Sequence, residues 1–215
     1  MIEYQMQITG WLFIAAALML WFGRVLLPVP IGVFFEPSVF PQIRKVFRRW
    51  IWLYRVHLFG CMVAVMAFVA LGTLLAETSA RILAWPATVV IGSGLFVNTL
   101  AEAFYYHFGA WGAQDMEGKS SESILAFIKS LQVSTEYVTC FTRFGRVFLG
   151  LGQIVLAIAM IYSGFMPKWV CVSGALLGFS GMGLTMALPD NLEYYRPLFH
   201  FTVLWLLALG GVLLM

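Results

Sequence analysis

Charged residues are scarce in this sequence. Asp, Glu, Lys and Arg make up 11% of its 215 residues, against about 25% in soluble globular proteins. Hydrophobic residues make up 61%, and the mean hydropathy is +0.89. So few charges exclude a soluble domain with a solvated surface, and a net charge of +3 without a basic soluble face gives no reason to expect a nucleic-acid partner. The composition predicts an integral membrane protein.

Cysteine is also rare, and the motifs of several enzyme classes are missing. Cys61, Cys140 and Cys171 stand far apart in apolar surroundings, with no CxxC spacing. We therefore expect buried thiols and no disulfide, redox pair or zinc site. The sequence has no phosphate-binding loop, nucleophile elbow or inverted repeat of broken helices. These absences argue against an ATPase, a serine hydrolase and a classical transporter.

Six apolar segments are each long enough to cross a bilayer, which takes about 20 helical residues. Their predicted bounds are 8–27, 51–75, 85–111, 144–162, 169–188 and 197–215. The fold class predicted is all-α, a polytopic bundle of six transmembrane helices in a single domain, residues 1–215. No basic residue precedes the first segment, so we expect it to be a retained span and not a cleaved signal peptide.

Two further stretches are amphipathic, because apolar residues recur at intervals of three and four, as on one face of a helix. They are Ile43, Val46, Phe47 and Trp50, with Arg44, Lys45, Arg48 and Arg49 opposite, and then Ile124, Phe127, Ile128 and Leu131. We expect both to form helices in the membrane interface, the first attracted to an anionic leaflet. The first is expected to continue without a break into the second span, and the second to begin at an N-cap, Ser120 or Ser121.

The distribution of basic residues predicts the orientation. With the N-terminus outside, eleven of the thirteen Lys and Arg fall on the cytoplasmic side, and Arg81 and Lys168 fall outside. The positive-inside rule therefore favours an N-out, C-out topology with both amphipathic helices on the cytoplasmic surface. In the fifth span, Gly174 and Gly178 form a GxxxG motif, which favours close packing on a neighbouring helix of the same chain.

The last third of the chain contains short motifs at turn and packing positions. They are Ser163-Gly-Phe-Met-Pro-Lys-Trp169, Arg196-Pro-Leu-Phe-His200 and Trp205-Leu-Leu-Ala-Leu-Gly-Gly211. Over roughly the last 60 residues, the sequence resembles a large bacterial family of six-span membrane proteins of unknown function. The resemblance implies six spans, but it implies no activity and no catalytic residues. We expect the protein in a bacterial inner (plasma) membrane.

Polar residues within the spans are the candidates for function, because a charge in hydrocarbon is costly and usually faces a protein interior. The third span carries Asn98, Glu102 and His107, and helical spacing places Asn98 and Glu102 on one stripe with a tyrosine, Tyr105 or Tyr106. By this reading Glu102 lies near mid-membrane. Three histidines, His57, His107 and His200, are predicted to lie at one level near the cytoplasmic end.

The first functional hypothesis makes Glu102 a general acid or base in a cytoplasmic-facing aromatic pocket. A desolvated carboxyl group can hold a proton near neutrality, and aromatic faces stabilise a carbocation. The substrate would be lipid-like, and isomerisation, hydration or cyclisation of an isoprenoid would fit. The catalytic candidates are Glu102, Asp190 and His107. The substrate-binding candidates are Asn98, Tyr105, Tyr106, Gln153 and Tyr195.

Two alternatives stand beside this hypothesis. In one, His57, His107 and His200 bind a metal with a carboxylate, or two of them hold a b-type haem. In the other, the protein is a non-catalytic lipid-binding protein or an accessory subunit of a membrane complex, and Glu102 forms a structural ion pair with Arg143 or Arg146. The bilayer and an apolar or lipid ligand are the expected partners, and homo-oligomerisation is left open.

Overall fold

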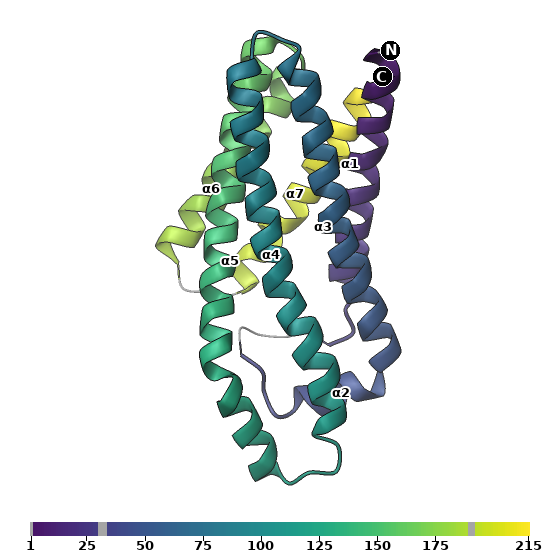
Figure 1. Ribbon diagram of the computed structural model, residues 1–215, viewed down its shortest axis with the longest axis vertical. Helices are drawn as coiled ribbons and strands as arrows, with labels where there is room; N and C mark the ends of the chain where they lie inside the picture. The colour runs from purple at the N-terminus through teal and green to yellow at the C-terminus, as the bar shows by residue number, and fades with distance from the viewer. Residues whose placement is uncertain (1, 30–33, 189–191) are drawn as a thin grey trace.

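The computed structural model describes residues 2–29, 34–188 and 192–215, and these residues form seven α-helices and no strand (Figure 1). The helices are α1 (Ile2–Val25), α2 (Val39–Lys45), α3 (Phe47–Ala76), α4 (Arg81–Asp115), α5 (Ser121–Ser163), α6 (Lys168–Ala187) and α7 (Leu192–Leu213). All but the short α2 are long and apolar enough to cross a membrane. The predictions of an all-α fold and of six apolar spans are confirmed.

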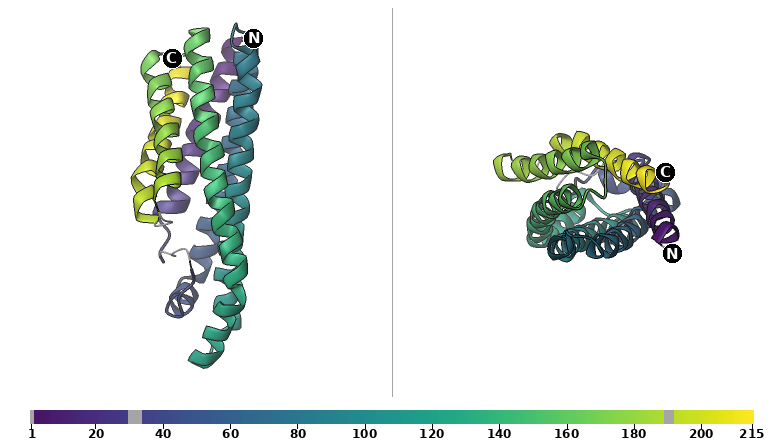
Figure 2. Two further views of the ribbon diagram at one scale, coloured as in Figure 1. Left: turned by 90° about the vertical axis from the view of Figure 1, so that its left-hand side faces the viewer. Right: turned by 90° about the horizontal axis from the view of Figure 1, so that it is seen from above.

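The six long helices form a closed ring. Each packs on the next long helix in the chain, and α7 packs back on α1, as the end-on view in Figure 2 shows. The chain passes up and down through the ring, so both termini lie at the same end (Figure 1). Large apolar side chains face outward, as suits contact with lipid: Phe59, Met66, Val89, Phe96, Ile158, Leu176 and Phe201 are all exposed.

Glycines let neighbouring helices approach closely. A Cβ atom added to Gly94 of α4 would lie 2.8 Å from the carbonyl oxygen of Gly145 on α5, and one on Gly178 of α6 would overlap the carbonyl oxygen of Gly150 on α5. Gly174 leaves room for the indole of Trp205 on α7, whose Nε1–H donates to the carbonyl oxygen of Val170 at 2.9 Å. The GxxxG prediction is confirmed, since both of its glycines pack within the chain.

Two helices are much longer than the bilayer is thick. At 1.5 Å per residue, the 35 residues of α4 and the 43 of α5 span about 52 and 64 Å, against a hydrocarbon core of about 30 Å. They project past the end of α1 together with α2 and the start of α3 (Figures 1 and 2). We call residues 34–54 and 104–142 the extension. A second hydrophobic cluster fills it, centred on Phe35, Phe40, Ile43, Trp50, Tyr54, Ala110, Ala113 and Leu131.

The two amphipathic stretches differ from the prediction. The first is broken at Val46, which has φ −121° and ψ 23° between α2 and α3, and Ile43 and Trp50 are buried in the extension. The second is no separate helix but the first turns of α5, which runs unbroken to Ser163 because no Gly or Pro interrupts residues 121–144. Its predicted N-cap is confirmed, since the side chain of Ser120 accepts from the backbone N–H of Ser123.

Smaller predictions at the helix ends also need correction. The third span begins at Arg81 and holds Pro86 inside α4, and α7 begins before Pro197. Cys61 and Cys171 are buried as expected, but Cys140 is exposed on α5.

The contact between α5 and α6 predicts a selective effect of adding one methyl group. Replacing Gly178 by Ala forces that methyl group against the backbone of α5, and overpacking of this kind costs about 1–3 kcal/mol. We expect the variant's melting temperature in detergent to fall by about 2–4 °C per kcal/mol.

Gly183→Ala on the same helix is the matched control, because no atom lies within 4 Å of a Cβ placed there. Equal melting temperatures for the two variants would contradict the close approach of α5 and α6.

Candidate functional site

Glu102 forms an ion pair with Arg24, which lies in the last turn of α1. The Arg24 Nη1 atom lies 3.3 Å from Oε1 and 3.5 Å from Oε2 of the carboxylate. The two side chains are 34% and 23% exposed, so the pair is partly withdrawn from the surface. Tyr54, His57 and Tyr105 lie close enough to interact electrostatically with both charges. The predicted partners, Arg143 and Arg146, are therefore wrong.

Glu102 lies far along α4 from the start of that helix. Glu102 lies 21 residues after the start of α4, or about 32 Å along the helix, which is a full hydrocarbon thickness. Its partner sits at the end of α1, so the pair lies where the ring meets the extension.

The three histidines do not gather around one point. His57 is buried, with Nδ1 3.3 Å from the carbonyl oxygen of Leu20. The ring of His57 and the ring of His200 both lie beside Phe199, whereas His107 is exposed on the extension and stacks on Trp111. Among the described residues, no three His, Cys, Asp or Glu side chains form a group that could hold a metal ion. The three-histidine metal site is not assembled.

The predicted catalytic residues are likewise not brought together within the described part of the chain. Asp190 lies outside the described residues. His107 follows Glu102 by five positions, about 140° around the helix at 3.6 residues per turn, and its ring lies against Trp111 and Phe108 on its own helix.

The stripe predicted on α4 is partly confirmed. Asn98 lies one turn before Glu102, and its buried Oδ1 makes no hydrogen bond within the described residues. This atom lies against Gly145 of α5. Tyr105 packs on Phe35 in the extension. Tyr106 accepts a hydrogen bond from Nε of Arg55 at 3.1 Å and so belongs to the contact between α3 and α4.

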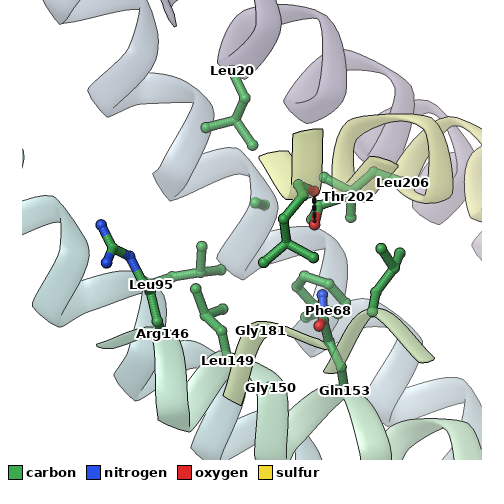
Figure 3. A pocket seen from close by; sticks show the side chains of 13 residues that line it. Leu20, Phe68, Leu95, Arg146, Leu149, Gly150, Gln153, Gly181, Thr202 and Leu206 are labelled. Carbon is green, nitrogen blue, oxygen red and sulfur yellow. Dashed lines mark hydrogen bonds between the residues drawn. The ribbon is translucent and has the colours of Figure 1, made fainter. Parts of the chain in front are cut away.

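A cavity of about 120 Å³ lies at the centre of the ring, lined by residues of all six long helices. Its walls are mostly apolar. They comprise Leu20 of α1, Ala64 and Phe68 of α3, Leu95 of α4, Arg146, Leu149, Gly150 and Gln153 of α5, Leu177 and Gly181 of α6, and Leu198, Thr202 and Leu206 of α7 (Figure 3). This central cavity lies within the ring, and Glu102 does not line it.

Two of the predicted substrate-binding residues belong to the central cavity or its edge. Gln153 lines it and is 6% exposed. Tyr195 is buried, and its ring lies under the guanidinium of Arg146, 3.7 Å from Cζ to the ring centroid. Arg146 and Gln153 are seven residues apart on α5, so they face the cavity from the same side of that helix, two turns apart.

Sequence reasoning missed Arg24 as the partner of Glu102, because it counted Arg24 only as a basic residue that sets the orientation, and it considered Arg146 only as a partner of Glu102. The sequence positions of these two arginines could have indicated their roles. Arg24 closes the first span at the level where the third span carries Glu102, and Arg146 shares a helical face with Gln153.

No protein family, curated protein or solved structure matches this chain.

The ion pair predicts a measurable coupling between α1 and α4. Hydrogen bonds to charged groups contribute about 1.5–3 kcal/mol, so we expect Arg24→Gln and Glu102→Gln each to lower thermal stability in detergent. The double variant should be no less stable than the less stable single variant. The effects of the two single changes would then sum to more than the effect of the double change, and this difference is a coupling energy of about 1–2 kcal/mol.

The more exposed pair between Arg44 and Glu117, 42% and 54% exposed, is the matched control. Its coupling should stay below about 1 kcal/mol. A coupling at Arg24 and Glu102 no larger than in the control pair would show that this contact does not hold α1 to α4.

Proposed function

We propose that this protein binds a lipid-like molecule whose end group enters the central cavity, and that it acts as a lipid-binding membrane protein. The observation that carries the proposal is the cavity itself. Residues of all six long helices line it, and its lining is apolar apart from a few polar groups, chiefly on α5. Pockets for small organic molecules have this character, with apolar walls and a few polar groups that orient the ligand.

The size of the cavity limits what can be enclosed. Its 120 Å³ compares with about 150 Å³ for an engineered cavity that binds benzene. The cavity therefore takes the end of a larger molecule, while the remaining chain passes between helices into the bilayer. The pair α6 and α7 offers the easiest passage, because these neighbours touch least extensively around the ring.

Binding is supported better than acid–base chemistry at Glu102. Arg24 lies 3.3 Å from this carboxylate at the junction of ring and extension, so the carboxylate is already engaged in a contact between two helices. The pair accounts for Glu102 as a contact between α1 and α4. Among the described residues that line the central cavity, none is a carboxylate.

The proposal includes an orientation in a bacterial inner membrane. Six of the thirteen Lys and Arg residues lie in the extension, whereas Arg81 and Lys168 lie at the opposite end, where α4 and α6 begin. This asymmetry favours a cytoplasmic location for the extension. The basic residues Arg44, Lys45, Arg48 and Arg49 would then lie near the headgroups of the inner leaflet, which attract basic side chains.

Filling the cavity tests the ligand. A Cβ on Gly181 would meet only Leu198, at an ordinary 3.5 Å, so the side chain of Gly181→Leu can occupy the cavity without a backbone clash. We expect the lipid-like molecule that is co-purified in mild detergent, extracted and quantified by mass spectrometry per mole of protein, to fall by about tenfold, since each 1.4 kcal/mol lost reduces binding tenfold.

Gly183→Leu is the matched control, because it lies two residues away on α6 with open space around its Cβ, and its ligand content should equal that of the unchanged protein. Undiminished ligand in the Gly181 variant, or no organic ligand in the unchanged protein, contradicts the proposal.

Cysteine labelling tests the orientation. In a background with Cys140, the exposed cysteine, replaced by Ser, Lys119→Cys in the connection between α4 and α5 should react with a membrane-impermeant thiol reagent only after lysis. Ser79→Cys, exposed between α3 and α4, should react in intact cells. The opposite pattern would reverse the topology.

A further inference from the structure

Gln153 presents an amide to the central cavity. The residue is 6% exposed, and Figure 3 shows its side chain among the cavity-lining residues. Within residues 2–29, 34–188 and 192–215, its amide makes no hydrogen bond. A hydrogen bond contributes about 0.5–1.5 kcal/mol, so a group that enters the cavity and bonds this amide gains affinity from it.

The depth of Gln153 constrains the partner. It lies ten residues from the end of α5 at Ser163, about 15 Å along the helix, which is half of a hydrocarbon thickness of about 30 Å. Among the described lining residues, the other polar groups are Thr202, which is already hydrogen-bonded, and Arg146, which lines the cavity at a different depth. The Thr202 hydroxyl donates to the carbonyl oxygen of Leu198 at 2.9 Å, and Arg146 is two turns nearer the extension, over Tyr195.

We infer that the ligand is a long-chain alcohol whose neutral hydroxyl group is bound by the amide of Gln153 near the middle of the membrane. This inference rests on the proposed function and names the chemical class of its ligand. An amide offers both N–H donors and a carbonyl acceptor, and a hydroxyl group can accept from the first and donate to the second.

Other head groups fit this position less well. At the depth of Gln153, two turns from Arg146, an anion such as a phosphate would use only the donors of the amide and would lose its hydration, which is costly. A hydrocarbon end would leave the amide without a partner. The cavity volume encloses a hydroxyl group and the first few carbons of a chain, and the rest of the chain leaves through the contact between α6 and α7.

Three probes that share one chain and differ in the head test the inference: farnesol, farnesyl phosphate and the hydrocarbon farnesene. Binding to the purified, delipidated protein is followed by the rise in melting temperature with probe concentration. We expect farnesol to bind about tenfold more tightly than either of the others, because one good hydrogen bond to a buried amide is worth about a factor of ten.

Gln153→Met keeps the length of the side chain and removes its hydrogen bonds. We expect the variant to melt at a higher temperature than the unchanged protein without ligand, because an unsatisfied amide is gone. Its affinity for farnesol should fall about tenfold while its affinity for farnesene is unchanged or better. Gln132→Met, at an exposed position of α5 in the extension, is the control and should change neither.

The outcomes separate the inference from the proposed function. Tightest binding of farnesyl phosphate, or equal binding of farnesol and farnesene with no effect of Gln153→Met, overturns the alcohol while the ligand site of the cavity stands. If no probe binds to the unchanged protein and Gly181→Leu has no effect on co-purified lipid, the cavity holds water only, and the inference and the proposed function both fail.

Discussion

The close approach of helices at glycine is the interaction on which this structure depends. In lipid, apolar side chains gain nothing from leaving the solvent, so helices associate through packing and hydrogen bonds. Glycine removes the side chain that keeps two backbones apart. Gly94 meets Gly145, Gly150 meets Gly178, and Gly10 meets Gly210. The last of these contacts joins α1 to α7 and closes the ring.

The closed ring explains why a cavity remains at the centre. Small residues draw adjacent helices together around the circumference, but six helices arranged in a ring are too many to converge on one axis. Side chains such as Phe68, Leu95 and Leu206 reach inward and fill most of the space. The space that remains is a cavity lined on α5 by the amide of Gln153 and the guanidinium of Arg146. Because these two groups lie at different heights along α5, the two ends of the cavity differ in polarity.

The extension places the remaining charges. Because α4 and α5 run beyond the bilayer thickness, Glu102 lies at the junction of ring and extension, where its pair with Arg24 keeps partial contact with solvent. The same length gives the apolar faces of α2 and of the first turns of α5 a protein surface to cover. Ile43 of α2, Trp50 of α3 and Leu131 of α5 are therefore buried in one cluster with residues of α4. Their spacing in the sequence would suit a helix lying on lipid equally well.

Periodicity and composition by themselves determined much of the fold. Scarce charge and six long apolar segments require helices, because only helices or closed barrels satisfy the backbone in hydrocarbon. Gly174 and Gly178 indicated a packing face by their spacing. Gln153 stood out as a deep polar residue in an apolar span, and Ser120 as a helix start.

Only the tertiary structure decided which of these residues meet. The rotation of each helix and the end of each span are not encoded in local apolar pattern, since lipid-facing and buried side chains are equally apolar in a membrane protein. For this reason the sequence offered Arg143 or Arg146 as the partner of Glu102, whereas packing pairs Glu102 with Arg24. Packing also gives His107 and His57 different neighbours, Trp111 for His107 and the Leu20 carbonyl for His57. The amide of Gln153 became a candidate ligand group only when six helices closed around it.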